Sequence, residues 1–228
     1  MSYDLPAGSH SKERRPKLTM SLKFKLAMLL EWKIYIFVLA AVVMVMISSP
    51  LVLAEETESG WRSKFSLTES TIIAGFGKGG FTEGSYEHIG LIWQLGFDLR
   101  RVFSRLEDNR GTLTFIMEPT INTIISPVED NVEFGISFGL KYRYPLTQKL
   151  SGYVLASVGP HYITVKSTDQ ANGFIFFNTV GAGFSFFLTE KTALSLEYRF
   201  RHISNADTEE PNVGIESHIG AIGYSMFF

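Results

Sequence analysis

The sequence predicts an all-β protein, an eight-stranded antiparallel transmembrane β-barrel of the outer-membrane type. After residue 54, segments of barrel-strand length in which apolar and polar residues alternate recur between turn residues. Their apolar positions carry large side chains, and the opposite positions carry glycine and charges of both signs. Beyond the leader, no segment has the roughly 18 consecutive apolar residues of a membrane helix, which excludes a helical membrane protein.

Residues 1–54 are expected to be an N-terminal extension followed by a signal peptide that is cleaved. The segment Ile34–Ile47 is an unbroken apolar run preceded by lysines, and a cleavage pattern ends at Ala54. A permanent membrane helix is the alternative, but the run is short for a hydrocarbon core of about 30 Å. Met20 would be a more ordinary start for such a leader than Met1.

Composition narrows the function. The 228 residues include 21 Lys and Arg against 23 Asp and Glu, a balance that gives no sign of nucleic-acid binding. The chain has no Cys, so disulfides, thiolate metal sites and a cysteine nucleophile are excluded. Its 19 Phe, 9 Tyr and 3 Trp suit a small barrel with aromatic girdles on its outer surface.

Eight strands are expected within the barrel domain, residues 55–228: 67–78, 86–99, 112–123, 132–144, 151–163, 173–187, 191–203 and 214–228. In the second strand, the odd positions from Ile89 to Leu99 are apolar. The fourth alternates in the same way, with one apolar face: Val132, Phe134, Ile136, Phe138, Leu140 and Tyr142. The sixth does so with Phe174, Phe176, Val180, Ala182, Phe184 and Phe186. The facing of the fifth stays open, because Tyr153 and Leu155 compete with Val154, Ala156 and Val158.

A soluble β-sandwich also alternates and is the competing fold. The opposite faces of the strands argue against it, because they place charged residues beside glycines, as a narrow barrel interior requires. We expect these residues to pair inside the barrel: Glu118, Glu133, Lys141, Arg143, Glu197, Arg199 and Arg201. A final strand that ends on Phe228 is also typical of outer-membrane barrels. The glycines of the Gly75–Gly80 segment precede no helix, so we interpret them as a turn with small inward-facing residues rather than a phosphate loop.

The last two strands carry polar residues on their apolar face. The even positions Leu194 to Phe200 are apolar and lead to His202 and Ser204, and the positions of the final strand that share the face of Ile222 include Glu216 and His218. Bare polar groups in hydrocarbon are costly, so their placement requires a functional reason. If the hairpin is symmetric about residue 209, His202 faces Glu216 with Cβ atoms about 5 Å apart.

These residue types suit nucleophilic acyl transfer from an ester dissolved in the bilayer. A serine hydroxyl becomes nucleophilic when histidine takes its proton, and a carboxylate holds the imidazole in the required tautomer. Asn205 can donate its amide NH₂ to the oxyanion, and Asn212 is a second candidate for that role. The alternative is that all of these are ordinary polar residues at a strand–loop boundary. His88 and His161 have no comparable partners and are expected to be structural. No cluster has metal-ligand spacing, so neither a metal nor another cofactor is expected.

Around this hairpin the sequence resembles the lipid A 3-O-deacylase (PagL) family. The shared features are His202-x-Ser204-Asn205 at the end of the penultimate strand, Pro211-Asn212-x-Gly214 in the loop, and Glu216. The resemblance implies His202 as general base, Ser204 as nucleophile, Glu216 as the orienting acid and Asn205 in the oxyanion hole, all facing lipid on the barrel wall. The chain departs from the family in its long segment before the signal peptide and in an acidic loop that contains Asp207, Glu209 and Glu210.

We therefore expect an outer-membrane serine esterase that hydrolyses an ester-linked acyl chain of lipid A, at the 3 position. Lipid A or lipopolysaccharide is the expected substrate and outer-membrane lipid the surroundings, and the oligomeric state stays open. A non-enzymatic structural or adhesion barrel is the first alternative. An outer-membrane phospholipase is the second.

Overall fold

The computed structural model describes residues 66–82, 84–103, 110–126 and 131–228, and the expected leader at 1–54 lies outside them. Their strands are β1 (Leu67–Phe81), β2 (Gly84–Asp98), β3 (Thr112–Ser126), β4 (Asn131–Pro145), β5 (Leu150–Ile163), β6 (Gly173–Thr189), β7 (Thr192–Ser204) and β8 (Ile215–Phe227). A short 3-10 helix, η1 (Leu99–Arg101), follows β2. No helix in the described part of the chain is long and apolar enough to cross a membrane.

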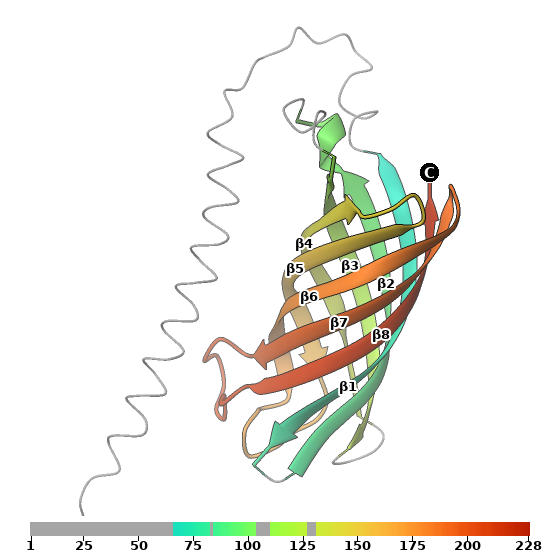
Figure 1. Ribbon diagram of the computed structural model, residues 1–228. Coiled ribbons are helices and arrows are strands. Elements are labelled where there is room, and N and C mark those ends of the chain that lie inside the picture. The colour runs from blue at the N-terminus through green and yellow to red at the C-terminus, as the bar shows by residue number, and fades with distance from the viewer. Residues whose placement is uncertain (1–65, 83, 104–109, 127–130) are drawn as a thin grey trace, which may run out of the picture. The chain divides into compact units, whose positions relative to one another are not determined.

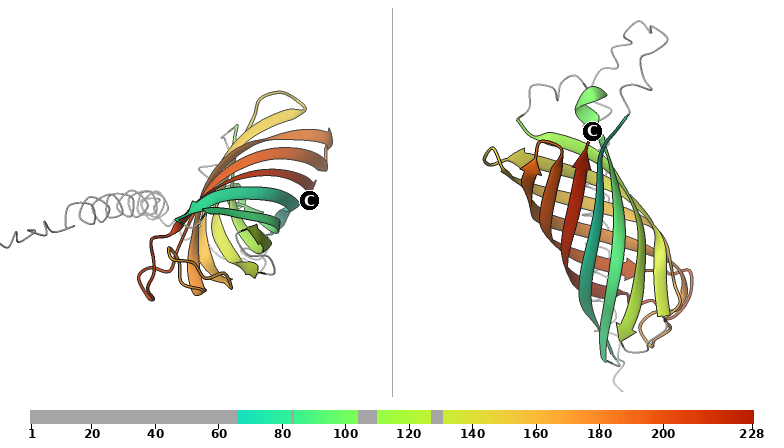
Figure 2. Two further views of the ribbon diagram at one scale, coloured as in Figure 1. Left: turned by 90° about the horizontal axis from the view of Figure 1, so that it is seen from below. Right: turned by 90° about the vertical axis from the view of Figure 1, so that its right-hand side faces the viewer.

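Each strand pairs antiparallel with its neighbour in sequence, and β8 pairs with β1 to close the barrel (Figures 1 and 2). The predicted fold class, an eight-stranded antiparallel barrel of the outer-membrane type, is confirmed. Large apolar side chains cover the outside, as with Leu196 and Ile222, which are 65% and 66% exposed. Closure leaves no unpaired sheet edge, which is the condition for a sheet to exist in lipid.

The structure decides the facing of β5. Tyr153 and Leu155 are 7% and 5% exposed and face the interior, whereas Val154 and Val158 are 56% and 42% exposed and face outward. Tyr153 Oη donates a hydrogen bond to Glu197 Oε2 at 2.9 Å. The hydroxyl of the buried tyrosine therefore has the hydrogen-bond partner that a buried polar group needs.

Two local predictions are wrong. The Gly75–Gly80 segment is not a turn but part of β1, although Gly75, Gly77 and Gly79 do face the interior. A Cβ on Gly77 would overlap the imidazole of His88, so glycine here makes room for a side chain of the neighbouring strand. Leu99 does not continue the outward apolar face of β2, because it lies in η1 and is buried.

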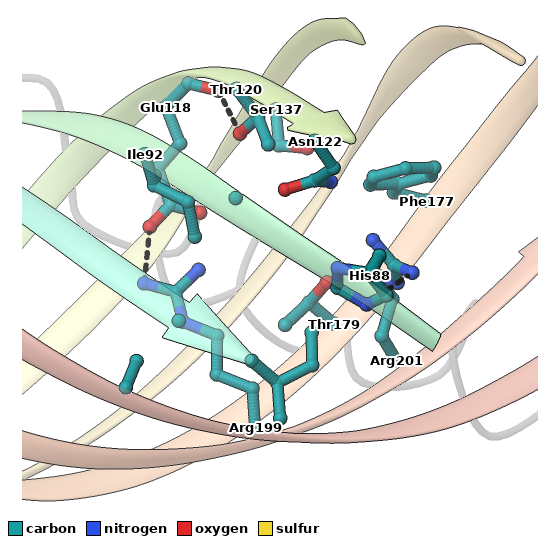
Figure 3. A pocket seen from close by; sticks show the side chains of 14 residues that line it. His88, Ile92, Glu118, Thr120, Asn122, Ser137, Phe177, Thr179, Arg199 and Arg201 are labelled. Atoms are coloured by element: carbon teal, nitrogen blue, oxygen red, sulfur yellow. Dashed lines mark hydrogen bonds and ion pairs between the residues drawn. The ribbon is translucent and has the colours of Figure 1, made fainter. Parts of the chain in front are cut away.

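The barrel interior is filled by ion pairs, as the alternation predicts. Three buried pairs are Lys141–Glu69 (2.6 Å), Arg199–Glu118 (2.8 Å) and Arg201–Glu133 (2.6 Å). Arg199 also pairs with Glu197, and Arg143 with Glu69. A cavity of about 30 Å³ remains beside Arg199, Arg201 and His88 (Figure 3), with room for ordered water only.

An apolar cluster closes the interior at the end of the barrel opposite the C-terminus. Its members are Phe81, Tyr86, Ile124, Ile163, Val165, Ile175, Phe177, Ile203 and Ile215. Ile203 and Ile215 are fully buried and pair with each other across β7 and β8. Because side chains alternate along a strand, burying these two residues directs His202, Ser204 and Glu216 to the outer wall.

Candidate active site on the outer wall

The register of the last hairpin places His202 of β7 directly opposite Glu216 of β8. This is the pairing expected for a hairpin centred on residue 209, and it brings the two Cβ atoms to about 5 Å. Ser204 is the next outward position of β7 and lies opposite Phe176 of β6. The three residues therefore lie together at the end of the barrel where the β7–β8 loop begins (Figure 1).

The three side chains differ in access. Ser204 is 3% exposed, His202 is half-buried and Glu216 is exposed. The wall below them is apolar, with Leu194, Leu196 and Tyr198 each about half exposed or more. Of the three side chains, Glu216 is therefore the most accessible from outside and Ser204 the least.

Gly214 lies against the imidazole of His202. A Cβ on Gly214 would be 2.8 Å from His202 Cε1 and 3.2 Å from its Nε2. Gly214 also has φ +87°, a backbone conformation that residues with a side chain rarely adopt. The loop backbone therefore lies so close to the histidine ring that only glycine fits at this position.

Asn205 and Asn212 are joined within the β7–β8 loop. The Asn205 backbone N–H donates to Asn212 Oδ1 (2.9 Å), and Asn212 Nδ2 donates to Asp207 Oδ1 (2.8 Å). Asn205 Nδ2 donates to the carbonyl of Glu209 (2.6 Å), and its Oδ1 is buried without a hydrogen-bond partner among the described residues. Since an amide NH₂ carries two hydrogens, Asn205 keeps one donor for a ligand.

Asp169, in the loop between β5 and β6, connects three loops at this end of the barrel. Its carboxylate accepts hydrogen bonds from the backbone N–H and the hydroxyl of Thr82, next to the β1–β2 turn. Its carbonyl accepts from Val213 N at 2.7 Å, and the neighbouring Gln170 pairs with Asn212. The loop that carries both asparagines is thereby held to the rest of the barrel.

Asn178 is a polar residue of the outer wall that the sequence reasoning missed. It lies on β6 directly opposite His202, on the side away from Glu216, and is half-buried. The signal is a break in the outward apolar series of β6, where an amide stands between Phe176 and Val180. Asn178, His202 and Glu216 form one polar row across three strands.

His88 and His161 lie inside the barrel, away from this row. His88 Nε2 is 2.9 Å from Arg201 Nη2, and His161 stacks on Phe177 with ring centroids 3.6 Å apart. Both are packed among interior residues, in agreement with the structural role expected for them. Among the described residues, no group of three or more His, Asp or Glu is arranged to hold a metal ion.

The family model of lipid A 3-O-deacylase (PagL) matches residues 87–225, more than half of the chain. The chain belongs to this PagL family. The matched range contains Ser204, His202, Glu216 and both loop asparagines, so the row described above lies within the family's shared region.

The solved structure of Neisserial surface protein A has the same fold. Neisserial surface protein A is 18% identical, with a TM-score of 0.56, and the match covers 72% of this chain and 98% of that one. The outer membrane enzyme PagL is 16% identical over 68% of this chain and 99% of that one, with a TM-score of 0.48. No curated protein sequence matches this PagL-family chain.

Proposed function

We propose that this protein is an outer-membrane serine esterase that hydrolyses the ester-linked acyl chain at the 3 position of lipid A. The observation that carries the proposal is the pairing of His202 with Glu216 on the outer wall, with Ser204 one outward position further along β7. Membership of the PagL family supports lipid A as the substrate.

The residues have separate roles. Ser204 Oγ attacks the acyl carbonyl as His202 takes the hydroxyl proton, and the Glu216 carboxylate stabilises the imidazolium that forms. Negative charge on the carbonyl oxygen is met by the remaining Asn205 amide hydrogen, with Asn212 holding the Asn205 backbone in position. The intermediate collapses, and the sugar oxygen leaves with the proton from His202.

The second half of the reaction uses the same groups. His202 takes a proton from water, the hydroxide attacks the acyl-serine carbonyl, and the fatty acid leaves as Ser204 recovers its proton. The outward placement lets the ester reach the site by lateral diffusion within the membrane. Its approach from the β8 side is supported by the exposure of Glu216.

Mass spectrometry of lipid A treated with the purified full chain tests the proposal. The chain should release one fatty acid and leave a free hydroxyl at position 3. The variants Ser204→Ala and His202→Gln should each lose activity at least about a thousandfold, and Glu216→Gln somewhat less. Circular dichroism should show an intact barrel in all three.

Other outcomes assign the protein differently. Full activity in Ser204→Ala or His202→Gln would remove the mechanism. Loss of an acyl chain from another position would keep the esterase and correct its regiochemistry. Cleavage of phospholipid but not lipid A would identify a phospholipase, and no cleavage of either would leave a structural barrel.

A further inference from the structure

A second polar cluster lies on the outer wall beside the proposed active site. His218 is exposed on β8, two residues beyond Glu216, and its Nδ1 is 2.5 Å from Tyr198 Oη of β7. The imidazole also packs against Phe200, with ring centroids 5.4 Å apart. With Nδ1 engaged by the tyrosine, Nε2 is the ring nitrogen left for a ligand.

Lys78 extends the cluster onto β1. The register places it directly opposite His218, and its side chain is 62% exposed. Its ammonium is 2.6 Å from Glu87 Oε1 of β2, which engages one of its three donors. Ionisable groups on a lipid-facing wall are costly, and those that occur there have a functional reason.

The wall is recessed next to His218. The following outward position of β8 is Gly220, which lies between Tyr198 on one side and Phe76 on the other. No atom lies within 4 Å of where its Cβ would be. A ligand that touches His218 therefore has room beside it.

The cluster and the active site lie at a similar depth in the membrane. His218 is two residues further along β8 than Glu216, so it lies about 5 Å deeper along the barrel axis for a strand tilt of roughly 40°. Because the strands are tilted, a side chain two strands away on β1 is displaced along the axis by about 6 Å from its counterpart on β7. This displacement is toward the loops at this end, where the β1–β2 hairpin extends further than the β7–β8 loop (Figures 1 and 2). Lys78 thus lies near the depth of His202, sideways along the wall.

Charge is distributed unevenly around the site. The β7–β8 loop exposes Asp207, Glu209 and Glu210. The β1–β8 side presents the Lys78 ammonium and the His218 imidazole, beside the carboxylates of Glu216 and Glu87. An anionic group attached to the substrate is repelled from the loop, and the Lys78 ammonium is the charged group that attracts it on the β1–β8 side.

We infer that Lys78 and His218 bind a phosphate group on the head of the lipid whose ester reaches Ser204. This rests on the proposed function for the identity of the lipid. The phosphate accepts hydrogen bonds from the Lys78 ammonium and from His218 Nε2, while Tyr198 holds the imidazole. Glu87 keeps Lys78 close to the wall when no lipid is bound.

Binding to the Ser204→Ala full chain in detergent micelles tests the inference without turnover. Phosphorylated lipid A should bind at least about tenfold more tightly than the same lipid with its phosphates removed, since each hydrogen bond to a charged group contributes strongly. Adding Lys78→Gln or His218→Gln should remove most of this preference and leave binding of the dephosphorylated lipid unchanged. Lys166→Gln, which removes another exposed lysine in the β5–β6 loop, is the matched control and should keep the preference.

The other results overturn the inference. They are equal binding of both lipids by the Ser204→Ala chain, a preference that survives both substitutions, and an equal loss for both lipids. Saturable binding of inorganic phosphate with the same affinity would instead assign a free-anion site. If the wild-type chain cleaves no ester but the binding results hold, the proposed function fails and the phosphate site stands.

Discussion

Gly214 approaches His202 so closely that a methyl group on its Cα would lie 2.8 Å from the imidazole Cε1. The contact joins the base of the proposed triad to the first residue before β8. Gly214→Ala should therefore displace the ring, and it also strains a backbone with φ +87°. A displacement of about 1 Å in a catalytic group lowers kcat by roughly a hundredfold. Steady-state hydrolysis of lipid A measures it, and Gly152→Ala, whose Cβ would come no closer than 3.5 Å to its neighbours, should retain wild-type kcat.

Asn178 offers its amide on the opposite side of His202 from Glu216. Asn178→Leu should lower kcat/KM by about tenfold, which corresponds to the loss of one hydrogen bond to the substrate. The barrel should unfold at the same urea concentration or a higher one, because leucine suits a lipid-facing position. Val180→Leu, one outward position along β6, is the control. Unchanged kcat/KM in Asn178→Leu would make the amide incidental.

Asp169 should affect how firmly the β7–β8 loop is held rather than the stability of the barrel. Asp169→Ala removes both hydrogen bonds from Thr82 and frees the β5–β6 loop from the β1–β2 turn. Esterase activity should fall several-fold, because Val213 and Asn212 lose a fixed neighbour, while the unfolding midpoint of the strands barely changes. Limited proteolysis should cut the β7–β8 loop sooner than in the wild type. Equal proteolysis of both proteins would contradict this role.

Arg201 should be important for stability. Its guanidinium pairs with Glu133, which is fully buried, and it also contacts Tyr86 and His88. Arg201→Met leaves that carboxylate without its cation and should destabilise the barrel by about 3–5 kcal/mol. Urea unfolding in detergent measures the difference. The double variant Arg201→Met with Glu133→Leu should recover part of the loss, since the unpaired charge is gone.

Alternation along the chain was sufficient to predict the barrel and which residues of its last hairpin face outward. The register of that hairpin was an assumption of symmetry about residue 209, which the pairing of His202 with Glu216 matches. One face of each strand contacts lipid and the other contacts the packed polar interior, so apolar and polar residues alternate along the sequence. The strand ends were less predictable. β1 continues to Phe81, where it pairs with Gly84 of β2. Gly77 lies within this strand and leaves space for His88, a contact between residues eleven positions apart that no local pattern reveals.

The parts of the site that were missed depend on pairing across strands. Asn178 is separated from His202 by a full turn between β6 and β7, and its relevance follows from register alone. Asp169 and Thr82 are 87 residues apart in the sequence, and closure of the barrel brings their loops together. The sequence did not show which face of β5 points inward, because Tyr153 has an apolar ring and a polar hydroxyl. Its hydroxyl bonds to Glu197 on another strand, and this contact is not visible in the local pattern.

The charged interior has a consequence for the cell that carries this protein. Among the described residues, the cavity beside Arg199 and Arg201 has a volume of about 30 Å³, and the apolar end cluster fills the interior at the end opposite the C-terminus. A barrel filled in this way is expected not to conduct ions, so planar bilayers containing the purified protein should show the conductance of bare lipid.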